Sequence, residues 1–485
     1  MIAVRRERLR VRPAAAMVSL LLLFSSAAGC SLGDPPEPEF ALIYNKAAQH
    51  HGPDRNPIIA IPGLLGSKLF DPLSGTLVWG AFEPSAASPD DPEGARLIAL
   101  PIDGDADLED VRDDVEPDGV LDKVRIRMLG VPLEVQAYAG ILATLGAGGY
   151  RDEALGLGGE VDYGRDHFTC FQFAYDWRRD NVENAKRLHE FIKEKREYVR
   201  AEYKKTYGID KRDIKFDIAA HSMGGLITRY FLMYGSQDLG PNGRAPRVTW
   251  EGAQYVERVV LIGPPNAGSP EALLNLITGR KIGPLLPMFP PALLGTFHSP
   301  YQLLPRPRHN AVVYDGDPSR PVDVLDPEVW AGLGWGLADP DQAQILEVLM
   351  PDVADPAERR ARALVLQRRV LTRARAFMNA MDRPATTPEG LDIYLVAGDA
   401  LPTTARVSID STTGEPSVIG TAPGDRTVLR SSAVLDERVG RAWQPFVVTP
   451  LDLRTTMFLP EEHLALTRNA VFRDNVLYWL LEAPR

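Results

Sequence analysis

The chain has 485 residues, of which 45% are hydrophobic and 25% charged, and its formal net charge is -11. These values are typical of a globular protein with a large buried core, folded as two compact bodies or as one large domain with insertions. Apart from its N-terminus the chain contains no Lys/Arg-rich block, so its acidic character excludes nucleic acid as the expected partner.

The N-terminus has the features of an export signal. Five arginines within the first 12 residues precede an apolar run at residues 17–24, which is too short to span a bilayer. The small residues that end in a Gly-Cys pair at Cys30 resemble the lipobox of bacterial lipoproteins, and this resemblance implies that Cys30 is lipidated. We predict a lipoprotein-type signal peptide at 1–29 and an exported protein anchored in the outer membrane or at the cell surface. The alternative is an ordinary secretory signal cleaved near Ala28.

Residues 30–55 begin with a Pro-rich, acidic stretch, and we predict that they form a tether between the anchor and the folded body. The chain has only two cysteines, so no disulfide framework is expected if Cys30 carries lipid. Cys170 lies in a strand-like run at 167–173 with no apparent basic neighbour, which predicts a buried structural thiol.

Strand and helix patterns alternate from about residue 57 to 270. Short apolar runs at 57–61, 167–173 and 256–262 predict strands, and segments with apolar residues at helical spacing lie between them. This alternation is typical of an α/β fold with a mostly parallel sheet covered on both faces. In such sheets the chemistry lies at the carboxyl ends of the strands.

Residues 83–121 interrupt the alternation. They are rich in Asp, Glu, Pro and Gly and show no sustained period, which predicts an inserted surface excursion. Asp103, Asp105 and Asp107 alternate as the first ligands of a calcium loop would. The turn glycine and the final glutamate of that loop are absent, so a solvated loop is the favoured interpretation, and no metal site is expected.

A second interruption spans residues 270–388, which we interpret as a lid and cap inserted between two parts of the sheet domain, at 56–269 and 389–485. Within it, residues 285–294 are apolar and broken by proline. This stretch suits a lid that turns its apolar face to lipid, and a buried inter-domain loop is the alternative.

Residues 220–225 read Ala-His-Ser-Met-Gly-Gly and are the centre of the functional prediction. They follow an alternating run at 214–218 and precede a run at 226–232 that lacks Gly and Pro, which predicts strand, tight turn and helix. A serine on so sharp a turn has its hydroxyl pushed out of the backbone path, and small neighbours let strand and helix approach closely. Ser222 is therefore the candidate nucleophile.

A serine nucleophile needs a histidine base and an acid that orients the histidine. Alpha/beta hydrolases present these groups in the chain order Ser, acid, His, and His463, before the terminal helix, fits that order. Asp399 and Asp425 both suit the acid by position, and the residue pattern alone leaves the choice open.

Acyl transfer also needs two backbone N–H groups that point at the oxygen that becomes negative. A glycine-flanked loop at residues 62–67 follows the first predicted strand and can present one of them. The candidates are the N–H groups of Leu64, in this loop, and of Met223, directly after the candidate nucleophile.

Six short motifs occur in the order in which they are found in the lecithin:cholesterol acyltransferase family, which includes lysosomal phospholipase A and phospholipid:diacylglycerol acyltransferases. They are Pro-Gly-Leu-Leu-Gly-Ser at 62–67, Gly-Tyr-Arg-Asp at 149–152, Tyr-Asp-Trp-Arg at 175–178, Ala-His-Ser-Met-Gly at 220–224, Leu-Pro-Thr at 401–403 and Gly-Asp-Arg-Thr-Val at 424–428. The chain thus resembles this family from about residue 57 to its C-terminus. It departs from the usual pattern at Ala220, where the family commonly has glycine, and at Arg426.

The resemblance implies an alpha/beta hydrolase fold with a lid and cap that acts on lipid acyl esters without metal or cofactor. It also implies that Ser222 is the nucleophile, Asp425 the acid and His463 the base, with Leu64 and Met223 as oxyanion donors. We therefore predict a lipid acyl-ester hydrolase or acyltransferase that works through an acyl-enzyme at a membrane surface. The alternatives are a carboxylesterase for small soluble esters and a catalytically silent surface binding protein that retains the fold.

Overall fold

The computed structural model describes residues 38–50, 52–104, 106–128, 131–156, 167–240, 243–283 and 286–484, without the side chains of 125–136. The predictions about the signal peptide, Cys30 and Asp105 lie outside these residues. The chain divides into residues 1–39 and a compact unit formed by residues 40–485, which is the body described below. Within the described residues no helix is both long enough and apolar enough to cross a membrane.

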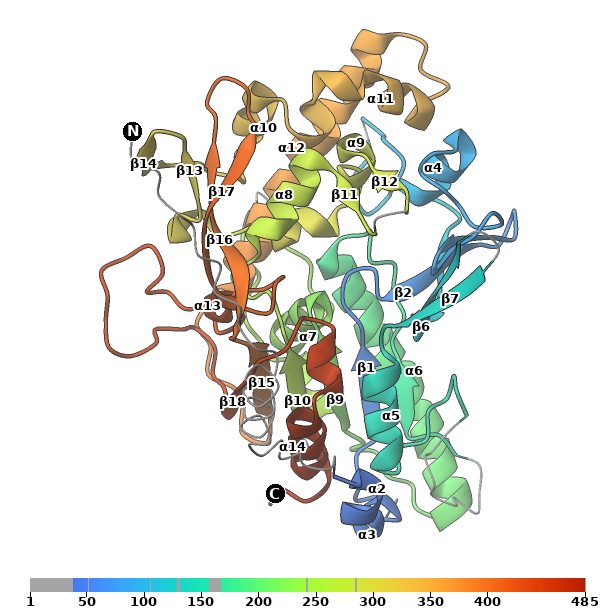
Figure 1. Ribbon diagram of the computed structural model, residues 1–485. Coiled ribbons are helices and arrows are strands. Elements are labelled where there is room, and N and C mark those ends of the chain that lie inside the picture. Colours follow the sequence, from blue (N-terminus) through green and yellow to red (C-terminus); the bar gives the residue numbers. More distant parts are fainter. Residues whose placement is uncertain are drawn as a thin grey trace, which may run out of the picture. The chain divides into compact units, whose positions relative to one another are not determined.

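A six-stranded parallel sheet forms the centre of the body (Figure 1), and it confirms the predicted α/β fold. Its strands are, in sheet order, β18 (Thr455–Leu459), β15 (Asp392–Gly398), β10 (Val256–Ile262), β9 (Phe216–His221), β1 (Ile58–Ile61) and β8 (Cys170–Gln172). Strands β1 and β9 are neighbours although β8 lies between them in the chain. Because all strands are parallel, their carboxyl ends share one edge of the sheet.

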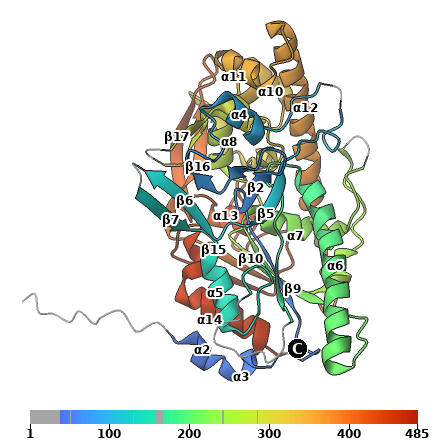
Figure 2. The same ribbon diagram turned by 90° about the vertical axis from the view of Figure 1, so that its right-hand side faces the viewer.

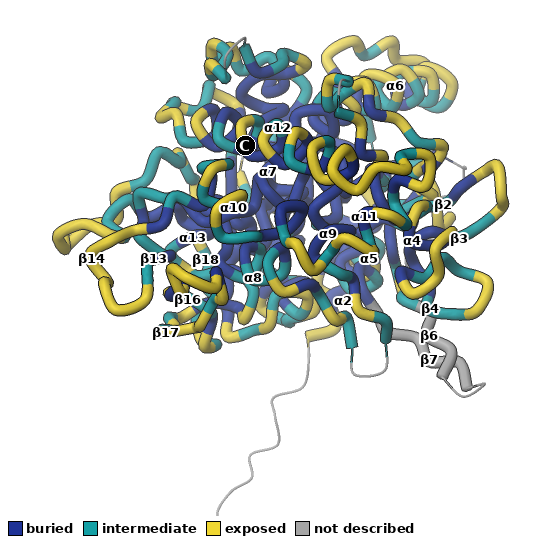
Figure 3. The backbone as a smooth tube through the Cα atoms, turned by 90° about the horizontal axis from the view of Figure 1, so that it is seen from above, coloured by how far each residue is buried: buried dark blue, intermediate teal, exposed yellow. Residues whose placement is uncertain are grey.

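Helices cover both faces of the sheet, as the edge-on view in Figure 2 shows. One face carries α5 (Ala139–Ala147) and α14 (Ala470–Leu481), and the other carries α6 (Asn181–Tyr207) and α7 (Met223–Tyr234). Successive side chains of a strand point to opposite faces of the sheet and so enter two different cores. In β1, Ile58 and Ala60 are buried on the first face, and Ile59 and Ile61 on the second. Figure 3 shows that the buried backbone is concentrated around α7, all of whose residues are buried.

The helix α6 begins and ends at residues with defined capping roles. The Asp180 carboxylate accepts hydrogen bonds from the backbone N–H groups of Val182 and Glu183. Gly208 ends the helix in the left-handed conformation with φ 72°.

The predicted tether at 30–55 is wrong from residue 40 onward. Residues 40–48 form two short helices, α2 (Phe40–Ile43) and α3 (Asn45–Ala48). Phe40 and Tyr44 are buried against Leu477 of α14, because residues 40–48 are mostly apolar and supply two aromatic side chains that cover that helix.

The segment at 83–121, expected at the surface, contributes to the core. It contains α4 (Pro92–Ile98) and β5 (Glu116–Val120), and its residues Ile98 and Val115 are buried in the main core. Two small sheets flank this segment: the first comprises β3 (Thr76–Trp79), β2 (Ser67–Asp71) and β5, and the second β4 (Ala81–Phe82), β6 (Lys123–Met128) and β7 (Val131–Gln136). Isolated apolar residues among many acidic ones gave no periodic signal in the sequence.

The cap is mostly helical. Its elements are α8 (Pro270–Thr278), β11 (Arg280–Lys281), β12 (Met288–Phe289), α9 (Pro291–Leu294), η3 (Ser299–Leu303), η4 (Pro307–His309), β13 (Val312–Tyr314), β14 (Asp317–Pro321), α10 (Pro327–Leu333), η5 (Gly336–Ala338), η6 (Pro340–Gln342), α11 (Ala343–Leu349) and α12 (Pro356–Met381). All four residues of α9 are buried, so this part of the predicted lid lies inside the cap. Met288, in the hairpin before it, is 41% exposed.

The cap and the second part of the sheet domain share a four-stranded sheet in the order β14-β13-β16-β17. The hairpin of β16 (Leu401–Ile409) and β17 (Pro416–Gly424) follows β15 in the chain, and β16 pairs in parallel with β13 of the cap. The hairpin leads to the short helix α13 (Arg430–Ala433). The two parts are therefore joined by backbone hydrogen bonds that the sequence pattern did not indicate.

Candidate active site

The turn between β9 and α7 has the geometry of a nucleophile elbow. Ser222 occupies it with φ 54° and ψ -125°, a left-handed backbone conformation that is rare for residues other than glycine. The small neighbours are required by close contacts: a Cβ at Gly224 would lie 2.4 Å from the Pro62 carbonyl oxygen, and a Cβ at Gly63 would lie 2.7 Å from the Ser222 Cβ. The loop after β1 therefore runs directly against the candidate nucleophile.

The structure brings Ser222, His463 and Asp425 together in one hydrogen-bonded series. His463 Nε2 lies 2.8 Å from Ser222 Oγ, and His463 Nδ1 lies 2.7 Å from Asp425 Oδ2. Because a carboxylate only accepts, Nδ1 carries the proton, which leaves Nε2 free to accept the serine proton. Ser222 and His463 remain partly exposed, whereas Asp425 is buried.

The environment of Asp425 favours its charged form. Burial alone would raise the pKa of this carboxyl, but the charge interaction and hydrogen bond with His463 hold it below its ordinary value. The backbone N–H groups of Thr427 and Val428 also donate to Oδ1, at 3.0 and 2.6 Å. These bonds fix the carboxylate and, through it, the orientation of the imidazole.

Of the two aspartates that the sequence left open, Asp425 is the one that contacts His463. Asp399 closely follows β15, and its backbone N–H donates to the Leu459 carbonyl. The β16–β17 hairpin returns the chain to the same strand end, where a Cβ at Gly398 would lie 2.5 Å from the Asp425 Cβ. The hairpin therefore explains how a residue 26 positions further along reaches the position next to β15.

The two predicted oxyanion donors lie on the expected elements. Met223 is the first residue of α7, where the N–H has no acceptor within the helix. Leu64 lies in the loop that passes Ser222, and its N–H has no hydrogen-bond acceptor among the described residues. This loop is held from both sides: the Tyr175 hydroxyl donates to the Pro62 carbonyl at 2.8 Å, and Trp79 Nε1 donates to the Leu65 carbonyl at 2.8 Å.

The motif at 175–178 has a structural role beyond that contact. The buried Arg178 side chain is paired with Asp176 and Asp113 and donates to the carbonyls of Leu97 and Ile98. It thereby fastens the segment at 83–121 to the sheet domain. These contacts make Asp176 and Arg178 a structural pair.

An apolar cavity of about 50 Å³ lies beside the loop at residues 62–67, which carries the candidate oxyanion donor Leu64 and is called the oxyanion loop below. Its walls include Leu64, Trp79 and Trp177 from the sheet domain and Phe289 and Leu303 from the cap. Trp79 packs edge-on against both Trp177 and Phe289, at ring-centroid distances of 5.5 and 5.9 Å. No pattern in the sequence predicts this cavity. The tryptophan of the motif at 175–178 is the residue that could have indicated an apolar pocket here.

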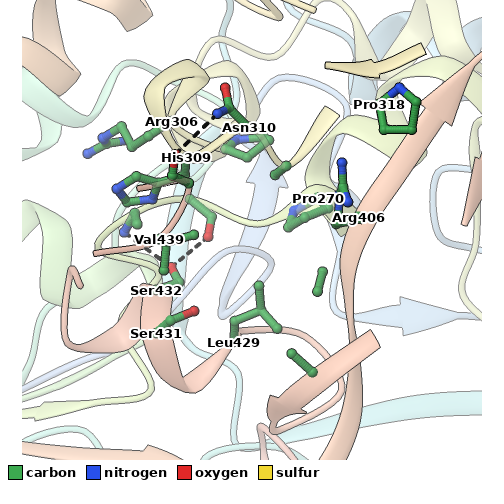
Figure 4. Close-up of a pocket in the computed structure, with 17 residues that line it drawn as sticks. Pro270, Arg306, His309, Asn310, Pro318, Arg406, Leu429, Ser431, Ser432 and Val439 are labelled. Atoms are coloured by element: carbon green, nitrogen blue, oxygen red, sulfur yellow. Dashed lines mark hydrogen bonds between the residues drawn. The ribbon is translucent and has the colours of Figure 1, made fainter. Parts of the chain in front are cut away.

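A larger cavity of about 420 Å³ lies between residues of the cap and residues of the β16–β17 hairpin and α13 (Figure 4). Pro270 of α8, His309 of η4, Arg406 of β16 and Ser432 of α13 contribute to its walls, and Ser432 Oγ donates to the Gly268 carbonyl at 2.6 Å. Neither Ser222 nor His463 lines either cavity, but Leu64, in the loop that passes Ser222, lines the smaller cavity and not this one. The smaller apolar cavity is therefore the one that adjoins the candidate site.

Two further observations concern metal ions and thiols. Within the described residues, no group of three or more His, Cys, Asp or Glu side chains is arranged to hold a metal ion. The Cys170 thiol is buried, and burial raises its pKa well above the ordinary value. This is the environment predicted for an inert structural thiol.

Residues 159–317 match the family model described as lecithin:cholesterol acyltransferase, which confirms the predicted resemblance over this range. A chain in the crystal structure of the Tle4-Tli4 complex has a TM-score of 0.52 at 16% identity, with 88% of this chain and 98% of that chain covered. EstA from Clostridium botulinum aligns over 94% of this chain and 92% of its own, at 13% identity and a TM-score of 0.32. Comparison with curated proteins gives no match. The first of the two structural likenesses agrees with the fold described above.

Proposed function

We propose, from the match of residues 159–317 to the lecithin:cholesterol acyltransferase family, that the protein is a serine-dependent lipid acyl-ester hydrolase or acyltransferase. The family match supports the substrate class and the type of reaction. The observation that carries the serine mechanism is the hydrogen-bonded series of Ser222, His463 and Asp425, at 2.8 and 2.7 Å, at the carboxyl ends of the strands.

In the proposed reaction, Ser222 Oγ attacks the ester carbonyl carbon while His463 Nε2 takes the serine proton. Asp425 holds the imidazole and stabilises its cation, and the N–H groups of Leu64 and Met223 donate to the oxyanion. Collapse of the tetrahedral intermediate breaks the bond to the alcohol, which leaves with the proton from His463. Water or a second alcohol then attacks the acyl-enzyme by the same steps in reverse.

We further propose that hydrolysis is the dominant outcome. Ser222 and His463 are partly exposed, so water can reach the acyl-enzyme. Transfer would require an acceptor alcohol that is oriented and water that is excluded. The cavity beside the oxyanion loop, at about 50 Å³, has room for only a few methylene-sized groups.

The same small volume supports movement of the cap during turnover. The hairpin of β11 and β12 brings Phe289 into the cavity wall and leaves Met288 exposed. A long acyl chain needs more space than this arrangement provides. We therefore propose that the hairpin moves aside when a lipid enters.

A loop between α13 and β18 supports a lipid surface as the place of action. Trp443 and Phe446 are 80% and 81% exposed, an unusual position for two large apolar side chains. Figure 1 shows the loop projecting beside α13. Its base is fixed, because the Glu437 N–H donates to the Val448 carbonyl at 2.7 Å and the Arg438 guanidinium donates to the Gln444 carbonyl at 2.8 Å. We propose that the two aromatic side chains enter the interface of a bilayer.

The central experiment follows the acyl group. Purified protein with phospholipid labelled in the acyl chain should release mainly free fatty acid, and added long-chain alcohol should yield labelled ester as a minor product. Ser222→Ala should abolish both products, and Ser319→Ala, at an exposed serine in β14, should abolish neither. Activity that survives Ser222→Ala would refute the serine mechanism. An excess of labelled ester over free acid at modest alcohol concentration would make acyltransferase the better description.

The loop is tested by binding to phospholipid vesicles. The double variant Trp443→Ser, Phe446→Ser should bind vesicles several-fold more weakly than the wild type and should hydrolyse a short soluble ester at the same rate. Leu73→Ser removes an isolated side chain that is 77% exposed and should change neither result. Equal vesicle binding by the double variant and the wild type would refute the role of the loop.

We also propose that the protein is exported and anchored through lipid on Cys30, because the Gly-Cys end of its N-terminal apolar segment resembles a lipobox. Protein from the native membrane should partition into detergent and carry mass beyond its sequence, and Cys30→Ala should prevent both. Unmodified protein that begins after Ala28 and is free of membrane would show that the signal is an ordinary secretory one.

A carboxylesterase for small soluble esters is the second candidate, and the small cavity volume favours it. The two candidates differ in their dependence on chain length. A lipid-acting enzyme should prefer long acyl chains presented in vesicles over short soluble esters. The opposite preference would identify the carboxylesterase.

A further inference from the structure

A buried chain of hydrogen bonds joins the oxyanion loop to the loop that carries the base. The Gly63 N–H donates to the Tyr138 hydroxyl at 2.8 Å, and the Tyr138 hydroxyl lies 3.0 Å from His221 Nδ1. On the other side of that ring, His221 Nε2 lies 3.0 Å from the His463 carbonyl oxygen. Tyr138 is the residue before α5, and His221 directly precedes the nucleophile. Neither was a candidate site residue in the sequence analysis.

The ends of this chain fix the direction of every bond. The Gly63 N–H can only donate, so the Tyr138 oxygen accepts there, and its own proton goes to His221 Nδ1 when that nitrogen carries none. The His463 carbonyl can only accept, so His221 Nε2 carries a proton. A neutral His221 with its proton on Nε2 satisfies both neighbours, and no donor or acceptor in the chain is left unused.

Burial keeps His221 in that neutral form. Tyr138 and His221 are 5% and 3% exposed. Desolvation, and then the nearby His463, lower the pKa of His221 to about 3, although the His463 carbonyl and the Asp425 charge act in the opposite direction. The two imidazole rings are 4.6 Å apart between centroids. A neutral His221 places no second positive charge next to His463 when that residue becomes an imidazolium.

The position of the strands shows why such a connection is needed. The oxyanion loop follows β1, next to β9, whereas His463 follows β18 at the sheet edge, with β15 and β10 in between. The loop that carries His463 must therefore extend past the ends of two strands to bring the imidazole to Ser222. An error of about 1 Å between base and oxyanion donor is enough to slow an acyl transfer strongly.

We propose that Tyr138 and His221 are positioning residues that hold the Leu64 loop and His463 in a fixed relation, so that the base and the oxyanion donor meet at the same carbonyl group. This Tyr138–His221 bridge rests on the proposed function, since it acts on the groups assigned there. Neither Tyr138 nor His221 lines the apolar cavity, and the observed hydrogen bond of Ser222 Oγ is the one with His463.

Tyr138→Phe is the sharpest test because it removes only the hydroxyl. We expect kcat for a soluble ester to fall about 10-fold to 100-fold, less than the loss from removing an oxyanion donor itself. KM should stay within about twofold, because a shift of the base relative to the oxyanion donor weakens transition-state stabilisation more than ground-state binding. Tyr234→Phe is the matched control: that buried hydroxyl donates to the Ala380 carbonyl at 2.8 Å, away from the site. It should leave kcat unchanged with a similar change in melting temperature.

Two replacements of His221 separate the halves of the bridge. A glutamine amide reaches the Nε2 position and can still donate to the His463 carbonyl, whereas an asparagine amide matches Nδ1 and can still meet Tyr138. Each should lose part of kcat, and Tyr138→Phe combined with His221→Gln should lose less than the product of the two single losses, because both interrupt one chain. Independent multiplication of the effects, or equal kcat for Tyr138→Phe and Tyr234→Phe, would overturn the proposal.

A readout without turnover keeps this test apart from that of the proposed function. The proton between His463 Nδ1 and Asp425 should give a far-downfield NMR signal in the wild type. The signal should weaken or broaden in Tyr138→Phe and remain in Tyr234→Phe. An unchanged signal in Tyr138→Phe refutes the bridge whether or not the enzyme hydrolyses lipid. A wild type that hydrolyses no ester and whose Ser222 resists a fluorophosphonate refutes the proposed function alone.

Discussion

The two sides of Ser222 are built in different ways. On the side of His463 and Asp425, polar groups meet at 2.6 to 3.0 Å, and each donor has an acceptor. On the side of the cap, Trp79, Phe289 and other apolar side chains enclose a small cavity. Hydrogen bonds demand one geometry, whereas apolar packing tolerates several. Under the proposed function, the polar side would set the reaction and the apolar side would select the acyl chain.

The largest expected effect lies on the polar side. Asp425→Asn keeps the shape of the carboxylate but cannot hold the His463 N–H in the same way or stabilise the imidazolium, so kcat should fall by about 10⁴-fold while the fold survives. Asp399→Asn should reduce kcat less than about threefold, because its carboxylate is not the one that contacts the imidazole. Ester hydrolysis by folded variants decides between them. The reverse order would show that the observed hydrogen bond is not the one used in catalysis.

A smaller effect is expected on the apolar side. Phe289→Ala should enlarge the cavity and shift the preference toward longer or bulkier acyl chains by about tenfold in relative kcat/KM, with a loss of unfolding free energy of about 3 kcal/mol. Met288→Ala, one residue earlier and exposed, is the control and should leave the preference unchanged. A chain-length profile for both variants tests this directly. If Phe289→Ala lowered all rates equally, the cavity would not be the acyl site.

The smallest effect concerns acid stability. The pKa of His221 is about 3 in the folded protein, below the ordinary value of 6.5, so between these values the unfolded chain binds a proton that the folded chain does not. Stability should therefore decrease as pH falls through this window, by up to about 1.4 kcal/mol per pH unit from this residue. Denaturant unfolding at pH 7 and pH 4.5 should show a smaller pH-dependent loss in His221→Gln than in the wild type. Parallel losses would mean that His221 does not titrate as assigned.

The sequence predicted those parts of the site that depend on neighbouring residues. The small residues on both sides of Ser222 indicated the elbow, and chain order selected His463 from eight histidines. Asp425 was different: position left it equivalent to Asp399, and only resemblance to a family separated them. The reason is the β16–β17 hairpin, which returns the chain to the end of β15 after more than twenty residues.

Long-range pairings were outside the reach of the sequence. Nothing local indicates that β13 of the cap pairs with β16, or that Tyr138 lies beside His221, because both depend on how distant elements pack. The prediction of a tether was wrong for a related reason. Phe40 and Tyr44 are buried by packing against Leu477, which lies more than 400 positions away in the chain. The Pro-rich, acidic start of the segment indicated a tether and could not show that two aromatic residues further along would pack on a helix.

The shared sheet of β13 and β16 sets the boundaries of an exchangeable module. Val407 and Ile409 of β16 are fully buried, and the parallel partner of β16 belongs to the cap. Excision of residues 270–388 alone would remove the partner of residues 407–409 of this strand and leave an unpaired edge there that favours association with other chains. A chimera that exchanges substrate preference between related proteins would therefore have to transfer residues 401–424 together with the cap. Because this hairpin also positions Asp425, the chimera would bring the hairpin that holds its own candidate acid.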